Sequence, residues 1–526
     1  MAIVASSSNV RASLRQQISQ QPRTSFATGS TSSSLFRSEE DAIIVELGSR
    51  WLHAGFEGES SPACTVGFGP QQSRRAGDYR DWLRGNLSDD ALSQLRTVAR
   101  DAEDWVREHE LWRMALRDVD LGLVEDKIER AFRDAYNKYL LTNAGTARLA
   151  LVLPSLVPHP LLSSILSTLF SRWRIPSITL LPSPTMSAVA AGLRSALVVD
   201  LGWAETTATG VYEYREISSR RSTRAMKAVQ QEMGKFLSSL AISSSGNSTP
   251  DAITVPFRYC EEVVNRFAWC RQFGNSSHEE YALSQKIVSV PSPSNPNSNY
   301  LGLPFSKFAD PVESVIFARG LEACELDDDE ESTPLLIYNT LLALPPDARG
   351  TCMSRIVFVG GGSRIPGLRR RILQEVSALF EKYGWSHTRG KVIELEFERQ
   401  RLQDLNISQS RANMGPQPHK DTETQSAKED IDYVEQKLRR YHNKEKNVPY
   451  VHGIFREVDS LGPWAGASLM VSLKTRGLVE IEREKYIQHG LAGASRDSES
   501  HPHAADRRSG LRSGGDRTSW TLGGWS

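Results

Sequence analysis

Two segments of the chain repeat one pattern of apolar and polar positions. Residues 42–48 and 196–202 both read as an apolar run followed by an acid, a leucine and a glycine. Such a run, ended by a glycine, is typical of a buried strand that enters a tight turn. A third strand is predicted at 356–359, where the chain continues through three glycines at 360–362 into a helical pattern at 367–380. The periodicity therefore predicts three strand-and-turn units.

The region between the first two units alternates between helix and strand patterns. Apolar residues recur at helical spacing over 124–141, with Val124 and Ile128 on one face. A strand pattern at 149–153 and a helix pattern at 161–170 follow. Alternation of this kind is typical of a layered α/β fold with a mixed sheet. Because the strand-and-turn unit is duplicated, we predict two facing lobes, each with a mixed sheet flanked by helices.

Stretches of biased composition divide the rest of the chain. Residues 70–118 are charged and carry Trp82, Trp105 and Trp112, which indicates a small outlying subdomain. The two ends are rich in serine and arginine with few apolar positions, so we expect them to be disordered. The predicted organisation is a disordered tail at 1–40, a first lobe at 41–200, a second lobe at 201–403, a polar insertion at 404–447, a return to the first lobe at 448–490 and a disordered tail at 491–526.

Composition excludes several classes of protein. The 526 residues include 63 basic and 63 acidic ones, so no net field favours nucleic acid, an anionic membrane or an acidic substrate. The five cysteines include no C-x-x-C pair, which argues against zinc and disulfides and fits a reducing compartment. The most apolar stretch, 149–170, is broken by prolines and is not a spanning helix. Residues 1–38 fit a disordered arm best, although their composition also matches a mitochondrial transit peptide.

The two repeated turns are candidate phosphate sites. Glycine amides beside an acidic strand end can bind phosphate, while the carboxylate holds the water shell of a metal ion. One such turn is usually only a turn, but two of them make a clamp. The first jaw is formed by Glu46, Gly48 and Ser49, and the second by Asp200 and Gly202.

The third turn supplies a place for a flat ligand. Gly360, Gly361 and Gly362 have no Cβ, so a nucleoside could approach the backbone closely, and Ser363 adds a hydroxyl. A strand-to-helix connection that needs positive φ explains the same glycines equally well. The chain has no G-x-x-x-x-G-K-[ST] loop and no G-x-G-x-x-G spacing, so neither a P-loop enzyme nor a dinucleotide oxidoreductase is supported. We find no G-x-S-x-G or H-E-x-x-H motif either, and we predict no catalytic residues.

The order of these motifs resembles the superfamily of actin, the heat-shock chaperones and the sugar kinases, and their details resemble actin. The resemblance covers roughly residues 41–490 without the insertions, and it implies an actin-like fold with a nucleotide cleft between the lobes. It rests on the first loop with Ala54-Gly55-Phe56, on Gly360 to Gly367, on Phe305 to Glu313 and on Trp464-Ala-Gly466-Ala-Ser468.

The first loop departs from the actin pattern at three positions. Glu46 replaces an aspartate, Arg50 replaces a flexible glycine, and His53 replaces the lysine that contacts phosphate in that family. In the second loop Asp200 and Gly202 are kept, but Trp203 replaces the next acid and Ala204 the next glycine.

Other positions depart from the family where it positions water and nucleotide. Ser183 falls near the place of the glutamine that orients water in actin, and Asn265 replaces an acid beside the nucleoside. Hydrolysis needs a positioned water and groups that neutralise the leaving phosphate. We therefore predict a degenerate ATPase with little or no hydrolysis, which holds ATP or ADP with Mg as a structural ligand or holds no nucleotide. The resemblance assigns the metal to Asp200 through Mg-bound waters and the nucleotide to Glu46, Gly48, Ser49, Arg50, His53, Asp200, Gly202, Gly360, Gly361, Gly362 and Ser363.

Within the actin-related proteins, the chain resembles the divergent fungal subunit at the pointed end of dynactin's short filament. The segment 334–349 is the most similar part, and altered phosphate loops argue against a polymerising actin. The resemblance implies a non-polymerising structural subunit in the cytoplasm, bound to actin-related filament subunits and other pointed-end subunits. The segment 70–118 would then contact neighbouring subunits through its tryptophans. The alternatives are a chromatin-remodelling subunit and, with less support, an active actin-type ATPase.

Overall fold

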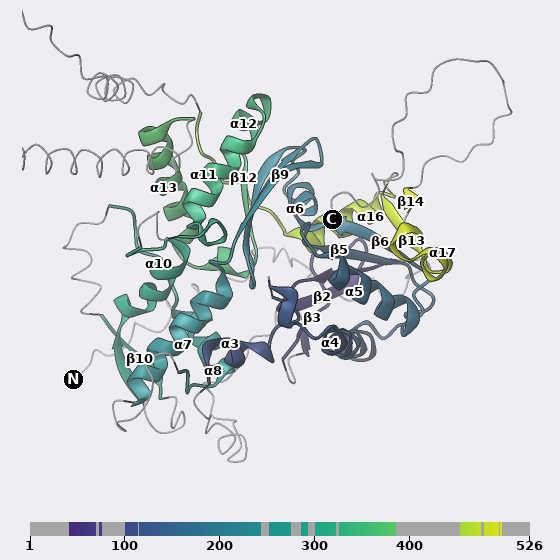
Figure 1. Cartoon of the computed structure of the whole chain (residues 1–526), viewed down its shortest axis with the longest axis horizontal. Helices are drawn as coiled ribbons and strands as arrows, with labels where there is room; N and C mark the ends of the chain where they lie inside the picture. Colours follow the sequence, from purple (N-terminus) through teal and green to yellow (C-terminus); the bar gives the residue numbers. More distant parts are fainter. Residues whose placement is uncertain are drawn as a thin grey trace, which may run out of the picture. The chain divides into compact units, whose positions relative to one another are not determined.

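The structure is a computed structural model, and Figure 1 shows the whole chain. The chain divides into Met1–Asp41 and Ala42–Ser526, and all described residues belong to the second unit. The predicted tail at 1–40, the insertion at 404–447 and most of the tail at 491–526 lie outside the described residues. The described residues are 42–69, 73–75, 100–113, 115–242, 252–274, 286–292, 300–321, 326–385, 453–474, 478–493 and 495–496.

The first lobe is built on a mixed sheet. Among the described residues, eight strands follow the order β14-β13-β6-β5-β1-β2-β3-β4. β1 is parallel to β5, and β5 to β6, whereas β2, β3, β4, β13 and β14 pair antiparallel with their neighbours. The strands are β1 (Ile43–Leu47), β2 (Trp51–Phe56), β3 (Cys64–Gly67), β4 (Ser73–Arg75), β5 (Leu149–Leu153), β6 (Ser177–Pro182), β13 (Val479–Glu482) and β14 (Ser495–Arg496).

Alternate residues of β1 face different helices, as the period of two requires. Ile43 and Val45 share a core with residues of α4 (Leu121–Asp134) and α5 (His159–Ser171). Ile44 points to the other face and packs with Trp464 of α16 (Pro463–Ser472). Both faces of the sheet are therefore covered by helices, which explains why the strands read as continuous apolar runs.

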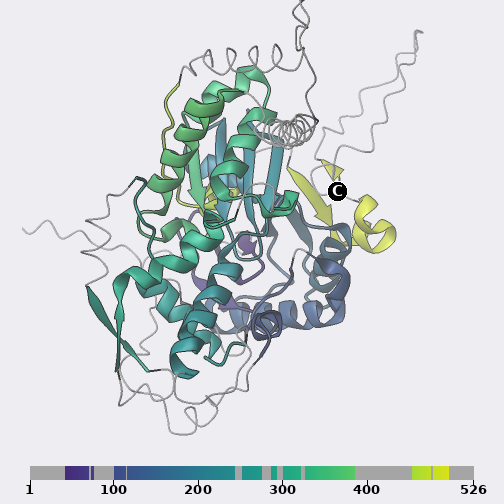
Figure 2. The same cartoon turned by 60° about the vertical axis from the view of Figure 1, so that its left-hand side comes forward.

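The second lobe repeats this arrangement on a smaller sheet. Its four described strands follow the order β12-β7-β8-β9, with β12 parallel to β7. Figure 2 shows the blue strands of this sheet beside green helices. Their side chains join α7, α8, α11 and α13 in the largest core. The elements are β7 (Ala196–Leu201), β8 (Thr206–Tyr212), β9 (Arg215–Ser222), β12 (Ile356–Val359), α7 (Met226–Ile242), α8 (Phe257–Phe267), α11 (Thr333–Ala343) and α13 (Leu368–Tyr383).

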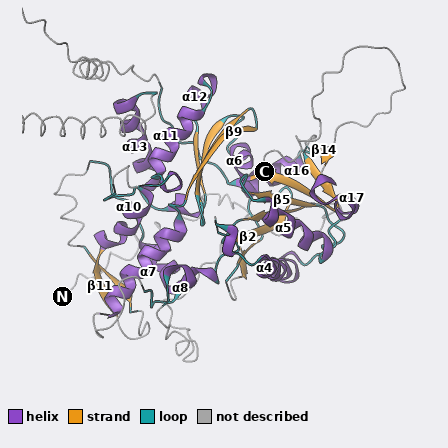
Figure 3. Ribbon diagram, viewed as in Figure 1, coloured by secondary structure: helices purple, strands orange, loops and turns teal. Residues whose placement is uncertain are grey.

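Shorter elements complete the described part of the chain (Figure 3). β10 pairs with β11 in a separate two-stranded ribbon. No described helix has the length and apolar character that crossing a membrane requires. These elements are α3 (Ala102–Arg107), η3 (Leu116–Asp118), the π-helix η4 (Ala135–Leu140), β10 (Ile287–Pro291), β11 (Tyr300–Pro304), η5 (Phe305–Ala309), α10 (Asp310–Ile316), η6 (Asp328–Glu330), α12 (Pro346–Met353), η7 (Gly361–Arg364), α17 (Arg483–His489) and η8 (Gly490–Gly493).

Two helices lie between the sheets. α6 (Ser183–Ala190) places Ala188 against the second sheet, in the small core that contains Val198 and Val357. Its Met186 shares a core with Trp464 of α16 and Ile44 of the first sheet. Because α6 contacts both sheets and α16 packs on α6, these helices fix how the two lobes meet.

Two mixed sheets flanked by helices confirm the predicted fold class. The prediction of an outlying subdomain at 70–118 is wrong for residues 100–113. Trp105 is 3% exposed and lies in the core of the second lobe, while Trp112 is 8% exposed and lies in that of the first. Their side chains are used inside this chain, because burying a tryptophan against other apolar groups is strongly favourable. Trp82 lies outside the described residues.

Candidate functional site

Two equivalent hairpins bring the predicted acids to one cavity. β1 and β2 pair antiparallel up to Leu47 and Leu52, and β7 and β8 pair in the same way up to Leu201 and Thr206. In each hairpin the acid, Glu46 or Asp200, lies one residue before the last paired residue of its strand. The sequence repeat therefore corresponds to a repeat of local structure.

The cavity between the hairpins is small. Its volume is about 150 Å³, whereas pockets that enclose drug-sized ligands measure roughly 300–1,000 Å³. Nine of the predicted nucleotide residues line it, together with Ser183 and Trp203. The nine are Glu46, Gly48, Ser49, Arg50, His53, Asp200, Gly202, Gly360 and Gly361.

Gly362 and Ser363 are not part of this lining. The Ser363 hydroxyl donates to the carbonyl of Gly360 at 2.7 Å, and a Cβ at Gly362 would lie 2.8 Å from the sulfur of Met226. Gly360 has a φ of +80°, and a Cβ there would lie 2.3 Å from Oδ1 of Asp200. Packing and backbone conformation thus account for glycine at 360 and 362. Gly361 has open space around it, as a ligand-facing position would.

The two acids of the hairpins lie near each other and are both half-buried. Burial, with the nearby charge of Asp200, raises the pKa of Glu46 to about 8. Burial also raises the pKa of Asp200 to about 6. A cation bound between them would offset both effects. The described residues include no cluster of three or more metal ligands, so Mg would need waters and phosphate oxygens to complete its shell. The assignment of Mg to Asp200 stays a prediction.

The acid pair makes stability depend on pH in a defined direction. A carboxyl whose folded pKa is raised favours the folded state at low pH, and this contribution is lost as pH rises from about 4.5 through about 8. Glu46→Gln removes the ionisation, so we expect it to stabilise the fold at pH 8.5 by on the order of 2 kcal/mol. At pH 4, below both pKa values, the variant should match the parent chain.

Urea unfolding at the two pH values, in the presence of a chelator, measures this effect. The exposed acid Glu484 of α17 provides the control variant Glu484→Gln, which should change stability by no more than about 0.5 kcal/mol. An equal effect of Glu46→Gln on stability at both pH values would contradict the raised pKa of Glu46.

Arg50 turns its charge toward the second lobe. Its side chain is 2% exposed, and Nη2 lies 2.9 Å from a carboxylate oxygen of Glu261 on α8. Nη1 donates to the carbonyl of His109 at 3.1 Å. The guanidinium also lies over the rings of Trp51 and Phe257, at 4.2 and 5.2 Å from their centroids. The charge of Arg50 is therefore engaged in a buried ion pair with Glu261. His53, at the lysine position, lies 3.0 Å from the hydroxyl of Thr65.

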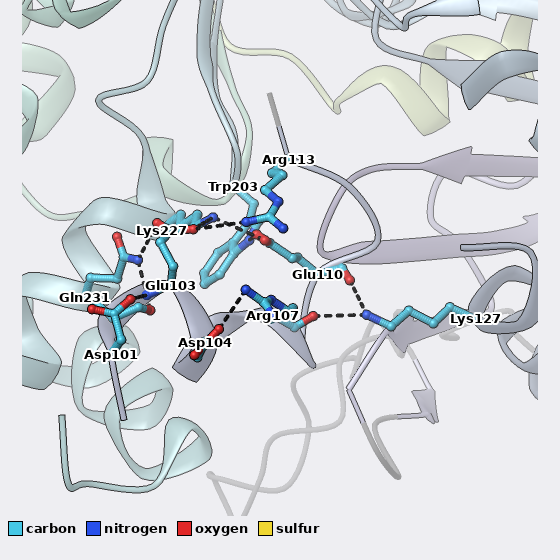
Figure 4. Close-up of polar contacts among 11 residues, drawn as sticks. Asp101, Glu103, Asp104, Arg107, Glu110, Arg113, Lys127, Trp203, Lys227 and Gln231 are labelled. Atoms are coloured by element: carbon cyan, nitrogen blue, oxygen red, sulfur yellow. Dashed lines mark hydrogen bonds and ion pairs between the residues drawn. The ribbon is translucent and has the colours of Figure 1, made fainter. Parts of the chain in front are cut away.

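Trp203 is likewise engaged within the chain, through a hydrogen bond to Glu110. Its indole N–H donates to a carboxylate oxygen of Glu110 at 3.1 Å, and the same carboxylate accepts from Lys227 of α7 at 3.1 Å (Figure 4). Sequence inspection identified Trp203 as a departure but missed Glu110, Lys227 and His109. For Glu110 and His109 the signal is the set of apolar residues around them, Val106, Leu111 and Trp112, which does not reveal a contact across the lobes.

Comparison with known proteins agrees with this geometry. Residues 37–249 match the family model described as Actin. The curated protein named actin-related protein 10, from Dictyostelium discoideum, is 20% identical over 362 residues. That match covers 64% of this chain and 73% of the relative.

Proposed function

Because the chain belongs to the actin-related protein family, we propose that it is a structural subunit of dynactin that caps the pointed end of the short filament. In that place it supports dynein-based transport along microtubules, in the cytoplasm and on the cytoskeleton. The resemblance of segment 334–349 to the divergent fungal pointed-end subunit supports this choice within the family, as does the similarity to actin-related protein 10.

The contact between Trp203 and Glu110 carries the proposal that the chain does not turn over ATP. An indole offers one N–H donor and no acceptor, so it cannot order the waters of a metal as a carboxylate does. Here that donor is used by Glu110 at 3.1 Å. Ser183 lines the cavity, but its side chain is too short to hold a water in line with a γ-phosphate. We infer a degenerate ATPase fold with little or no hydrolysis.

A nucleotide fits this cavity poorly. The cavity of about 150 Å³ is about half the lower end of the usual range for enclosed ligands. Mg, when bound with a nucleotide, neutralises phosphate charge. In this chain Glu46 and Asp200 are the groups that would face it, and Ser49 and Gly202 would offer backbone amides. The backbone N–H of Gly48 already donates to the carbonyl of Trp51 at 2.9 Å. The proposed capping role requires none of these ligands, because it depends on shape.

Capping of this kind works through two different faces. One face of the actin-like fold would dock on the last filament subunit. The opposite face, which differs from actin, would accept no further protomer and would instead bind the other pointed-end subunits. The chain would terminate the filament and would take no part in a polymerisation cycle driven by nucleotide hydrolysis.

The test is affinity purification of the tagged full-length chain from its native cells. We expect mass spectrometry to identify dynactin subunits among the copurified proteins, in stoichiometric amount with the chain. Chromatography of the small molecules released by acid should then give less than about 0.1 mol of nucleotide per mol of chain, as expected for a site with millimolar or weaker affinity. Recovery of chromatin-remodeller subunits in place of dynactin would overturn the proposal.

A further inference from the structure

Residues 100–113, which we term the bridging segment, run from one hydrophobic core to the other. Trp105 and Val106 belong to the core of the second lobe, and Leu111 and Trp112 belong to that of the first. All four are buried, and Trp112 also lines the cleft. The segment is therefore anchored in both lobes beside the cavity.

The anchor in the second lobe uses both backbone and side chains. Arg100 and Ile253 exchange two backbone hydrogen bonds, with N···O distances of 3.1 and 2.9 Å. The indole of Trp105 donates to the carbonyl of Val255 at 2.8 Å. Gln231 of α7 donates to the main chain of α3 at 3.1 Å. Backbone and side-chain hydrogen bonds therefore both attach this end of the segment to the second lobe.

In the first lobe the segment is anchored directly to the first candidate phosphate loop. The backbone N–H of Leu111 donates to the carbonyl of Ser49 at 2.7 Å. Lys127 of α4 donates to the carbonyl of Glu110 at 2.6 Å, and burial lowers the pKa of this lysine. The first loop is thus bonded to the bridging segment through the carbonyl of Ser49.

The middle of the segment contacts Trp203, which follows the second jaw, and the helices α7 and α8. Glu110 is 5% exposed and accepts from Trp203 and Lys227, each at 3.1 Å. The ring of His109 stacks on Phe257 of α8, with centroids 3.9 Å apart and an angle of 8° between the planes. Figure 4 shows Glu110 with Trp203 and Lys227 on one side and Lys127 on the other. Charged and stacking contacts therefore join the middle of the segment to the second lobe.

We propose that the bridging segment is a built-in lock that joins the two lobes across the cleft and takes the place of a bound nucleotide. A ligand closes a two-lobed cleft when it binds the closed arrangement better than the open one. Here the equivalent contacts come from a covalently attached segment, whose effective concentration is high. The closed arrangement is then independent of ATP, as a subunit with a fixed docking surface requires. The lock rests on the proposed absence of nucleotide turnover and not on which complex contains the chain.

The test compares the purified full-length chain with the variant Glu110→Ala. The parent chain, freed of nucleotide by a chelator and gel filtration, should keep its melting temperature within about 1 °C when Mg-ATP is added. Glu110→Ala removes the acceptor of Trp203 and Lys227, so its melting temperature should fall by at least about 5 °C. Small-angle scattering should give a larger radius of gyration for this variant than for the parent.

Glu108→Ala is the matched control, because it is the same change two residues away. Glu108 is 62% exposed at its side chain and pairs with Arg100 only at 3.7 Å. We expect it to match the parent chain in both measurements. Equal effects of the two variants would overturn the lock.

A measurement on the parent chain covers the case in which Glu110→Ala does not fold. In the nucleotide-free chain, the amides of Leu111 and Ile253 should exchange with solvent as slowly as those of the central strands β1 and β7. Fast exchange at both amides, slowed by Mg-ATP, would show that nucleotide closes the cleft and would overturn the lock. The proposed function would survive that result if dynactin subunits copurify, and the lock would survive recovery of remodeller subunits if the amides are protected.

Discussion

Replacing Gly466 by alanine should destabilise the chain by at least about 2 kcal/mol. A Cβ at this position of α16 would lie 1.9 Å from the carbonyl oxygen of Met186 and 3.2 Å from the nitrogen of Ala190. Both atoms belong to the backbone of α6, so they cannot move aside as a flexible side chain can. Alanine favours a helix over glycine by only about 1 kcal/mol, which does not offset such a contact.

Because α6 contacts both sheets, the effect should extend to the joint between the lobes. Urea unfolding followed by circular dichroism measures the loss of stability, and a lower m-value would indicate that the lobes no longer unfold together. Gly350→Ala in α12 is the control, since a Cβ there meets no atom within 4 Å. We expect that variant to gain about 0.5–1 kcal/mol. A Gly466→Ala variant as stable as Gly350→Ala would contradict the packing.

The elements that could be predicted from the sequence are those with a local signature. β5 begins and ends at the predicted residues because five apolar residues lie between polar segments. β1 and β7 were predicted from their shared apolar run, acid and glycine, and the same acids meet at one cavity because the duplicated hairpins face each other. A local pattern and its duplication can both be read directly from the sequence, so these elements could be predicted.

The contacts that close the cleft could not be predicted in this way. The bond from Arg50 to Glu261 joins residues 211 positions apart, and that from Trp203 to Glu110 joins residues 93 apart. Nothing in the spacing of a charged residue identifies a partner at such a distance. For the same reason we predicted that Trp105 and Trp112 lie in an outlying subdomain. The sequence of a charged segment does not show whether its tryptophans pack inside the chain or face solvent.

Replacing Arg50 by methionine should cost about 3–5 kcal/mol of folding stability. The substitution keeps much of the apolar stem but leaves the Glu261 carboxylate, which is 11% exposed, without the guanidinium 2.9 Å away. It also removes the donor to the carbonyl of His109. Breaking a buried pair from one side is costly because the remaining charge stays desolvated, whereas replacing both partners by apolar groups is often close to neutral.

A double-mutant cycle separates these contributions. Glu261→Met alone should also destabilise, whereas Arg50→Met with Glu261→Met should cost less than the sum of the single changes, by at least about 2 kcal/mol of coupling. The exposed pair of Arg194 with Glu213 provides the matched control, since its side chains are 67% and 48% exposed. Arg194→Met should change stability by no more than about 1 kcal/mol. If Arg50→Met proved as mild as Arg194→Met in urea unfolding, the two lobes would not be joined by this ion pair, and their closure would depend on the bridging segment alone.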